Sequence, residues 1–212
     1  SLTPTYIPAP GEADTVELVM MLFGYAPCGE LIDSKFLFII AAPDASAGSD
    51  IVSCGTTPVG IIGSKATNYA TIFWHTSGTG TFNDSTTLHP YYYPSLEDVI
   101  AGHVTLTLTA TAFTACSDAS DGLLLSLATP ATANAGEDKE SCIGVPYTVN
   151  DASAENYNYL HWTHNGAGTL IDANKITPTY IPQAGETGEV ILILKVFSDL
   201  PCDSVFDEKI LT

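Results

Sequence analysis

Three stretches of the chain, 16–23, 104–111 and 190–197, have a hydrophobic residue at every second position. Alternation with a period of two is typical of a β-strand that buries one face. The middle stretch, VTLTLTAT, is the clearest, because its aliphatic residues take one face and its threonines the other. Threonine and branched aliphatic residues also favour strands, and no long segment has the period of a helix. The pattern therefore predicts an all-β protein.

Each alternating stretch follows a copy of one phrase, which reads TPTYIP at 3–8 and 177–182 and HPYYYP at 89–94. A cysteine comes 12 positions after the start of each stretch (28 − 16, 116 − 104 and 202 − 190). A block with a cysteine, a tryptophan and a Gly-x-Gly precedes two of the three copies. Repeats of this kind decide the fold assignment before any other signal.

The alignment of the repeats gives two complete units and one half unit. Connectors rich in alanine, proline and glycine divide the chain into the C-terminal half of a domain at 1–43 and complete domains at 44–130 and 131–212. Units of about 80 to 90 residues with short strands predict tandem immunoglobulin-like β-sandwich domains. Because the phrase already occurs at residue 3, we expect the first fold to need strands from outside these residues.

The outward positions of the alternating stretches differ between the copies. The middle copy has threonines there, whereas the first and third copies have apolar residues. Apolar residues on a nominally solvent face indicate a cover, which is either another part of the same domain or another subunit. The residues of this possible assembly face are Val19, Met21, Phe23, Ile191, Ile193 and Phe197.

Charge narrows the classes of partner. The chain has 6 Lys+Arg and 24 Asp+Glu, for a net charge of −18, and every cation is a lysine. Phosphate backbones are neutralised by Lys and Arg, so the composition argues against nucleic acid and against anionic membranes. No apolar run approaches the roughly 18 residues of a membrane span, so we expect no membrane insertion.

The five cysteines allow two regular pairing schemes. The scheme that we predict closes each complete domain on itself, through Cys54–Cys116 and Cys142–Cys202, and leaves Cys28 unpaired. The alternative joins neighbours, through Cys28–Cys54 and Cys116–Cys142. We disfavour it because Cys28 would lie at the far pole of its own domain, whereas disulfide Cα atoms lie within about 7 Å. Disulfides indicate an oxidising, extracytoplasmic location.

The order of features resembles a known class of repeat. AGxD (47–50 and 135–138), Cys, Trp, Gly-x-Gly, Tyr-x-Pro, an alternating strand and Cys are similar to the PKD-like or immunoglobulin-like repeats of giant bacterial adhesins exported by the type IX route. The WDFGDG signature of standard PKD domains is replaced by FWHTSGTGTF and HWTHNGAGTL. The resemblance implies a non-catalytic, secreted array at the cell surface, whose partners are neighbouring repeats, glycans or a host surface.

A search for catalytic residues finds none. The histidines recur at no common repeat position, and no nucleophile elbow, HExxH or P-loop is present. We interpret Trp74 and Trp162 as core residues of the third strand. The chain is therefore not expected to be an enzyme.

Calcium is the small ligand that the sequence favours most. Acidic residues follow each repeated phrase and recur in the connectors, so carboxylates from both places would meet at the domain junctions. Such oxygens are the ligands that Ca²⁺ takes in proteins; the alternative is that they are solvated charges. The candidate ligands are Glu12, Asp14, Asp50, Glu97, Asp98 and Asp138.

Tyrosines mark one further candidate site. Tyr6, Tyr92 and Tyr180 share a repeat position and are predicted to fix the corner after the phrase. Tyr91 and Tyr93 replace Thr and Ile of the other copies, and they are candidates for an aromatic contact to sugar.

These observations predict a non-catalytic extracellular segment, structural or adhesive, of a large cell-surface protein. One alternative is a self-assembling subunit of an extracellular filament, completed by strand addition between neighbours. A third candidate is a carbohydrate-binding module.

Overall fold

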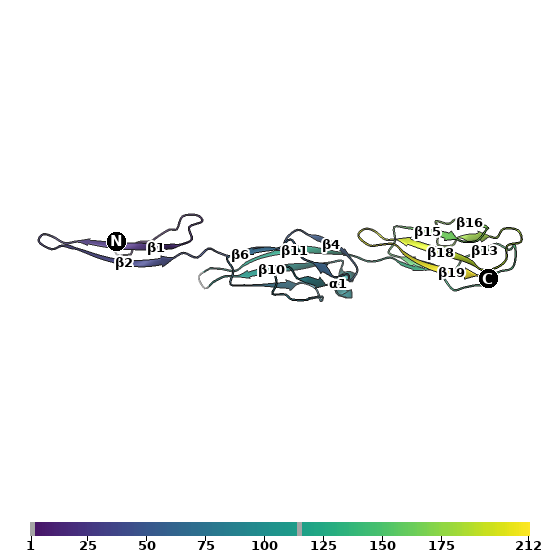
Figure 1. Ribbon diagram of the computed structural model, residues 1–212, viewed down its shortest axis with the longest axis horizontal. Helices are drawn as coiled ribbons and strands as arrows, with labels where there is room; N and C mark the ends of the chain where they lie inside the picture. Colours follow the sequence, from purple (N-terminus) through teal and green to yellow (C-terminus); the bar gives the residue numbers. More distant parts are fainter. Residues whose placement is uncertain (1–2, 114–115) are drawn as a thin grey trace.

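The computed structural model arranges three β-rich units end to end (Figure 1). The structure describes residues 3–113 and 116–212. Strands dominate, and the one helix among these residues, α1 (Leu96–Ala101), has six residues. The predicted all-β, immunoglobulin-like class is confirmed.

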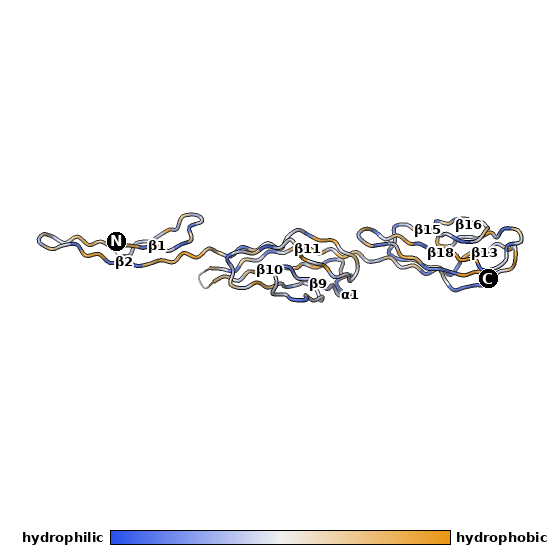
Figure 2. The backbone as a smooth tube through the Cα atoms, in the orientation of Figure 1, coloured by the Kyte–Doolittle hydropathy of each residue, from blue (hydrophilic) through white to orange (hydrophobic). Residues whose placement is uncertain are grey.

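The first unit is a single hairpin. Strands β1 (Thr15–Phe23) and β2 (Glu30–Phe38) pair antiparallel over their whole length. Apolar residues recur along both strands, as the orange stretches of the tube in Figure 2 show. By repeat position, this hairpin corresponds to the last two strands of each following unit.

The middle unit is a sandwich of two main layers. One sheet has the order β4-β11-β10-β7, with β4 parallel to β11, and the other has the order β5-β9-β8. The elements are β3 (Asp44–Ser46), β4 (Ile51–Cys54), β5 (Val59–Gly60), β6 (Lys65–Thr67), β7 (Thr71–Thr76), β8 (Thr81–Phe82), β9 (Tyr91–Tyr93), α1, β10 (His103–Thr111) and β11 (Ala119–Ala128).

The core of the middle unit follows the predicted alternation. Val104, Leu106, Leu108 and Ala110 on β10 are all buried, and they pack in one cluster with Trp74 of β7. Burial of these apolar side chains is the main stabilising contribution to the unit.

The third unit repeats this architecture. Its sheets have the orders β15-β18-β19 and β13-β17-β16, with a short β12-β14 pair beside them. The strands are β12 (Thr132–Asn134), β13 (Tyr147–Thr148), β14 (Ser153–Glu155), β15 (Tyr159–His164), β16 (Thr169–Ile171), β17 (Thr179–Ile181), β18 (Val190–Phe197) and β19 (Val205–Leu211). Val190, Leu192, Leu194 and Val196 point inward with Trp162, as predicted.

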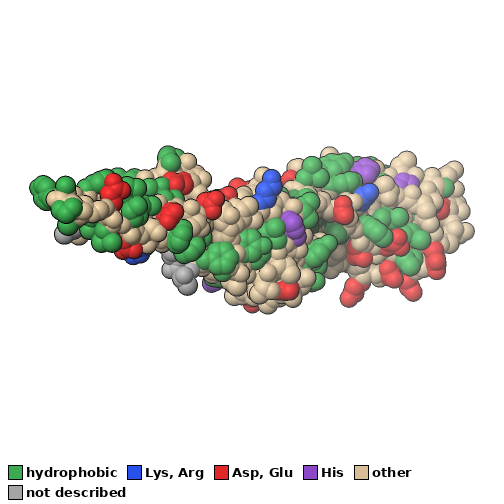
Figure 3. All heavy atoms as spheres, turned by 60° about the vertical axis from the view of Figure 1, so that its left-hand side comes forward, with side chains coloured by type: hydrophobic (Ala, Val, Ile, Leu, Met, Phe, Trp, Pro, Cys, Tyr) green, Lys and Arg blue, Asp and Glu red, His purple; other side chains and the backbone are tan. Residues whose placement is uncertain are grey.

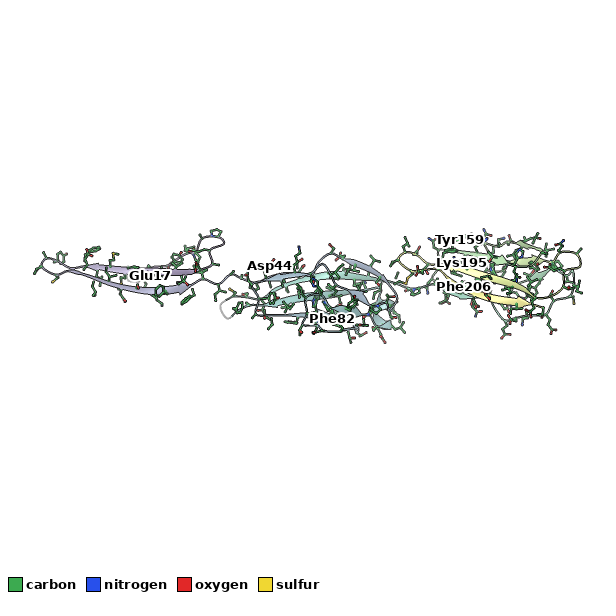
Figure 4. The ribbon with its side chains drawn as sticks, viewed as in Figure 1. Glu17, Asp44, Phe82, Tyr159, Lys195 and Phe206 are labelled. Atoms are coloured by element: carbon green, nitrogen blue, oxygen red, sulfur yellow. A yellow bond between two sulfur atoms is a disulfide. The ribbon has the colours of Figure 1, made fainter. Side chains whose placement is uncertain are left out.

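The outer face of this sheet is aromatic. Tyr159, Lys195 and Phe206, labelled in Figure 4, come from its three neighbouring strands. Tyr159 and Phe206 are exposed, and the Lys195 ammonium lies 5.0 Å from the ring centre of Phe197.

Candidate functional site: the domain junction

Each copy of the repeated phrase ends in the same contact. The tyrosine hydroxyl donates a hydrogen bond to a carboxylate six residues later, which closes the corner before the next long strand. The pairs are Tyr6 with Glu12 at 2.6 Å, Tyr92 with Asp98 at 2.7 Å, and Tyr180 with Glu186 at 2.8 Å. The predicted role of these tyrosines at the corner is confirmed.

The middle unit buries this contact most deeply. Asp98 also accepts hydrogen bonds from the backbone amides of Thr79, Gly80 and Ser95 at 2.8 to 3.1 Å. Burial acts to raise the pKa of Asp98, but the hydrogen bonds outweigh it and hold that pKa below its ordinary value. Burial raises the pKa of Tyr92 to about 12. Asp98 is thus a structural anion.

The calcium candidates are mostly engaged in backbone hydrogen bonds. Asp50 accepts from the Leu124 amide and Asp138 from the Ile210 amide, each at 2.8 Å. In the part of the chain that the structure describes, no group of three or more His, Cys, Asp or Glu is placed to hold a metal ion. Glu97 lies in the first turn of α1. Calcium binding at the junctions stays a prediction.

The sugar candidates lie on either side of a buried residue. Tyr91 and Tyr93 are 53% and 45% exposed, whereas Tyr92 between them is fully buried. The alternation of β9 therefore presents both outer rings to solvent. Sugar binding stays a prediction.

A disulfide joins the two sandwiches. Cys54, at the end of β4, is bonded to Cys202, in the loop between β18 and β19, with a Cα–Cα distance of 5.0 Å. The predicted pairs Cys54–Cys116 and Cys142–Cys202 are therefore wrong. The alternative pairs Cys28–Cys54 and Cys116–Cys142 are wrong as well, because Cys28, Cys116 and Cys142 are free thiols.

Strand direction is the physical reason for the correction. β4 runs parallel to the last four residues of β11, and its register sets Cys54 beside Ala128, where the chain leaves the unit. Cys116 lies in the connection between β10 and β11, at the opposite end of those strands. The thiol that reaches Cys54 is therefore Cys202 of the next unit, whose sulfur lies 3.7 Å from the Ala128 carbonyl oxygen.

Both units contribute to the surface around this disulfide. Where the chain enters the third unit, the Ser198 hydroxyl accepts a hydrogen bond from the Ala131 amide at 3.0 Å. A cleft beside the bond is lined by Val52, Ser53, Cys54, Thr57, Pro130, Pro201, Asp203 and Val205.

The first junction has the same local geometry. The Cys116 sulfur lies 3.6 Å from the carbonyl oxygen of Ile40, which is the repeat equivalent of Ala128 (40 + 88). The amide of Cys116 donates to Phe113, as that of Cys202 does to Asp199. The junction is therefore a repeated structural feature.

The possible assembly face divides into two parts. Val19, Met21 and Phe23 on β1 are 49%, 53% and 71% exposed, and hydrophobic side chains cover much of this unit in Figure 3. The members of this face on β18, which are Ile191, Ile193 and Phe197, are half-buried. A role in assembly stays a prediction.

The opposite face of β1 is open too. Leu18, Met20 and Leu22 are 36%, 46% and 47% exposed, although the equivalent residues of β10 form a core. No described residue packs over the ribbon to bury both faces.

A buried ion pair was not predicted from the sequence. Lys209 is fully buried, its ammonium lies 2.8 Å from Asp151, and it also donates to the Glu137 carbonyl oxygen. The hydrogen bond from Lys209 lowers the pKa of Asp151. The alternation of β19 puts Lys209 on the same inward face as Leu211. A lysine at an inward position of a strand was therefore the feature of the sequence that could have indicated a buried ion pair.

Comparison with known proteins supports the fold. No protein-family model matches the chain, and no curated protein matches it. The structure of the N-terminal eight Ig domains of Down Syndrome Cell Adhesion Molecule is similar, with a TM-score of 0.56 and 9% identity over 95% of this chain and 31% of that one. The insect immune protein hemolin gives a TM-score of 0.50 and 11% identity over 92% and 55%.

Likeness at these identities establishes the immunoglobulin-like fold alone. The chain spans about a third of the first of these structures and about half of the second. Within the described residues, no helix is long and apolar enough to cross a membrane.

Proposed function

We propose that this chain is a non-catalytic, extracellular segment of a large cell-surface protein, in which immunoglobulin-like domains form a stiff structural and adhesive array. The observation that carries the proposal is the disulfide between Cys54 and Cys202. A bond of this kind persists in oxidising, extracytoplasmic compartments. The resemblance to PKD-like repeats of type IX-exported adhesins supports export to the cell surface.

Stiffness follows from a double connection at the junction. The polypeptide joins the two sandwiches between Ala128 and Thr132, and the disulfide joins them again. A single short linker permits bending about itself, whereas two connections restrict rotation to one axis at most. A stiff segment holds whatever it carries at a fixed distance from its attachment.

Adhesion is the finer part of the proposal. Two of the similar structures are named for cell adhesion and homophilic adhesion, and this chain has exposed aromatic and aliphatic side chains on its hairpin and on the β15-β18-β19 sheet. Exposed apolar surface of this extent is typical of interaction surfaces.

Small-angle X-ray scattering tests the stiff array. The full chain is compared with a Cys54→Ser, Cys202→Ser double variant and with Cys116→Ser as the matched control. We expect the control to keep the extended distance distribution of the parent chain and the double variant to show a broader one. A double variant that matches the parent would contradict the role of the disulfide.

Bead aggregation tests the adhesive part. Beads coated with the chain are mixed with one another or with albumin-coated beads, and coated beads are also layered on cells. We expect clustering or retention only with the chain. Beads that neither cluster nor bind cells would overturn adhesion and leave a spacer.

A subunit of an extracellular filament is the second candidate. The observation that favours it is the exposure of both faces of the β1–β2 hairpin, since such a ribbon has two unpaired edges that strand addition can extend.

A further inference from the structure

Cys142 occupies the position in the third unit that Cys54 occupies in the middle unit. The carbonyl oxygen of Cys142 accepts a hydrogen bond from Val145 at 3.1 Å, as that of Cys54 does from Thr57 at 3.2 Å. The segment before Cys142 also runs parallel to the last strand, through the bridge between residues 139 and 211. Cys142 therefore lies at the pole of the third unit that faces away from the middle unit, as an exposed thiol.

Cys28 occupies the position that Cys202 occupies in the bonded junction. Both follow a proline, and the amide of Cys28 donates to Tyr25 at 2.8 Å, as that of Cys202 does to Asp199 at 3.0 Å. Cys28 lies in the loop between β1 and β2, at the free tip of the hairpin, and is an exposed thiol.

The two halves of a junction disulfide therefore stand at opposite ends of one chain. Figure 1 shows the tip of the hairpin at one end of the row of units and the C-terminus at the other. Cys142 is close to the C-terminus, because the Ser141 amide donates to Thr212 at 2.7 Å.

The pole around Cys142 is hollow and largely apolar. A pocket of about 220 Å³ next to Cys142 is lined by Tyr180, Pro182, Val190 and Leu211. The loop that carries Cys28 brings Pro27 and the 96% exposed Tyr25. At the bonded junction, Pro201 of the equivalent loop lines the cleft beside the disulfide.

We propose that copies of this chain join head to tail, with the Cys28 loop of one copy seated at the third-unit pole of another copy and a disulfide between Cys28 and Cys142. The occupant of the pole is a second copy because the same chain carries both members of the pair. The contact joins two different surfaces, so it continues into a filament instead of closing into a dimer.

Bond formation requires a disulfide oxidant, such as oxidised glutathione. The Cys142 thiolate attacks it to give a mixed disulfide and one glutathione thiolate. The Cys28 thiolate of the second copy then attacks the Cys142 sulfur and releases the second glutathione. Two protein thiols are oxidised, one glutathione disulfide is reduced to two thiols, and the protons of the protein thiols pass to the released glutathiones.

The inference rests on the junction geometry and deepens the filament candidate, and it is independent of adhesion.

The full chain is incubated with reduced and oxidised glutathione, and the products are separated on non-reducing gels. We expect a ladder of dimers, trimers and larger species, and a cross-linked peptide pair that contains Cys28 and Cys142.

Single substitutions make the test specific. Cys28→Ser and Cys142→Ser each leave one exposed thiol of the pair, so we expect loss of every species above the dimer. Cys116→Ser is the matched control and keeps the ladder. An unchanged ladder in either variant, or peptides that link Cys28 to Cys28, would overturn the proposal.

Two further measurements separate loss of the ladder from loss of folding or of stiffness. Because both thiols are exposed, the melting temperature of each variant should match that of the parent. Failure of the ladder leaves the Cys54–Cys202 bond and its scattering signature intact, so this proposal and the stiff array fail by different measurements.

Discussion

The tyrosine–carboxylate pair is the smallest feature that all three units share. The repeated phrase identified the tyrosine, but the carboxylate partner required knowledge of the turn, because the acid is Glu12, Asp98 or Glu186 in the three copies. The sequence analysis placed two of these carboxylates, Glu12 and Asp98, at a metal site, whereas the structure uses Asp98 to hold backbone amides. Side-chain chemistry alone does not distinguish these two uses.

Tyr92→Phe should destabilise the middle unit by about 1–3 kcal/mol, because Asp98 stays buried and loses one of its donors. Urea unfolding followed by tryptophan fluorescence measures the change. Tyr91→Phe is the matched control, with a change within about 0.5 kcal/mol, since that side chain is exposed. Equal effects would contradict a structural role for the Tyr92 hydroxyl.

The pKa values of Asp98, Asp151 and Glu186 are lowered in the folded chain. A lowered pKa means that the unfolded chain binds more protons, so this stability is present above the ordinary carboxyl pKa and is lost as the pH falls through the lowered value. Melting temperature should therefore drop steeply below about pH 4. Asp98→Asn should flatten this dependence, and an identical slope would argue against the assignment.

At the scale of elements, alternation predicted which strands exist and which faces are buried wherever a second sheet covers them. It succeeded for β10 and β18 and for Trp74 and Trp162. It did not extend to β1, because burial depends on a partner layer and not on the strand's own pattern. The predicted cysteine pairing was wrong for a related reason. Pairing depends on the direction of β4 relative to β11, and the spacing of cysteines along the chain does not reveal that direction.

Leu18 and Leu106 are repeat equivalents in different surroundings, 36% and 0% exposed. Leu106→Ala should cost about 2–5 kcal/mol, because it removes buried methyl groups and leaves a cavity. Leu18→Ala should cost about 1 kcal/mol or less. Urea unfolding of both variants measures the difference. A large cost at Leu18 would mean that the hairpin is covered in solution.

At the scale of the whole molecule, charge opposes contact between copies. With a net charge of −18, approaching chains repel one another, and salt screens this repulsion over about 10 Å at 0.1 M. We therefore expect head-to-tail disulfide formation to be faster at about 0.5 M than at about 0.02 M sodium chloride, because repulsion between the chains is screened more strongly at the higher concentration. Initial rates of dimer appearance on non-reducing gels measure the effect, and a rate that falls with salt would contradict it.

The junction disulfide also determines how the chain carries tension. A pull on the two ends passes through residue 54 directly to residue 202, so the 147 residues between them (202 − 54 − 1) bear no load. Both sandwich cores lie almost wholly inside this segment. In an optical trap, the oxidised chain should extend only through its ends, and a reductant should release up to about 500 Å of additional contour length. The bond therefore acts as a covalent bypass that limits how far the two sandwiches can be extended under load.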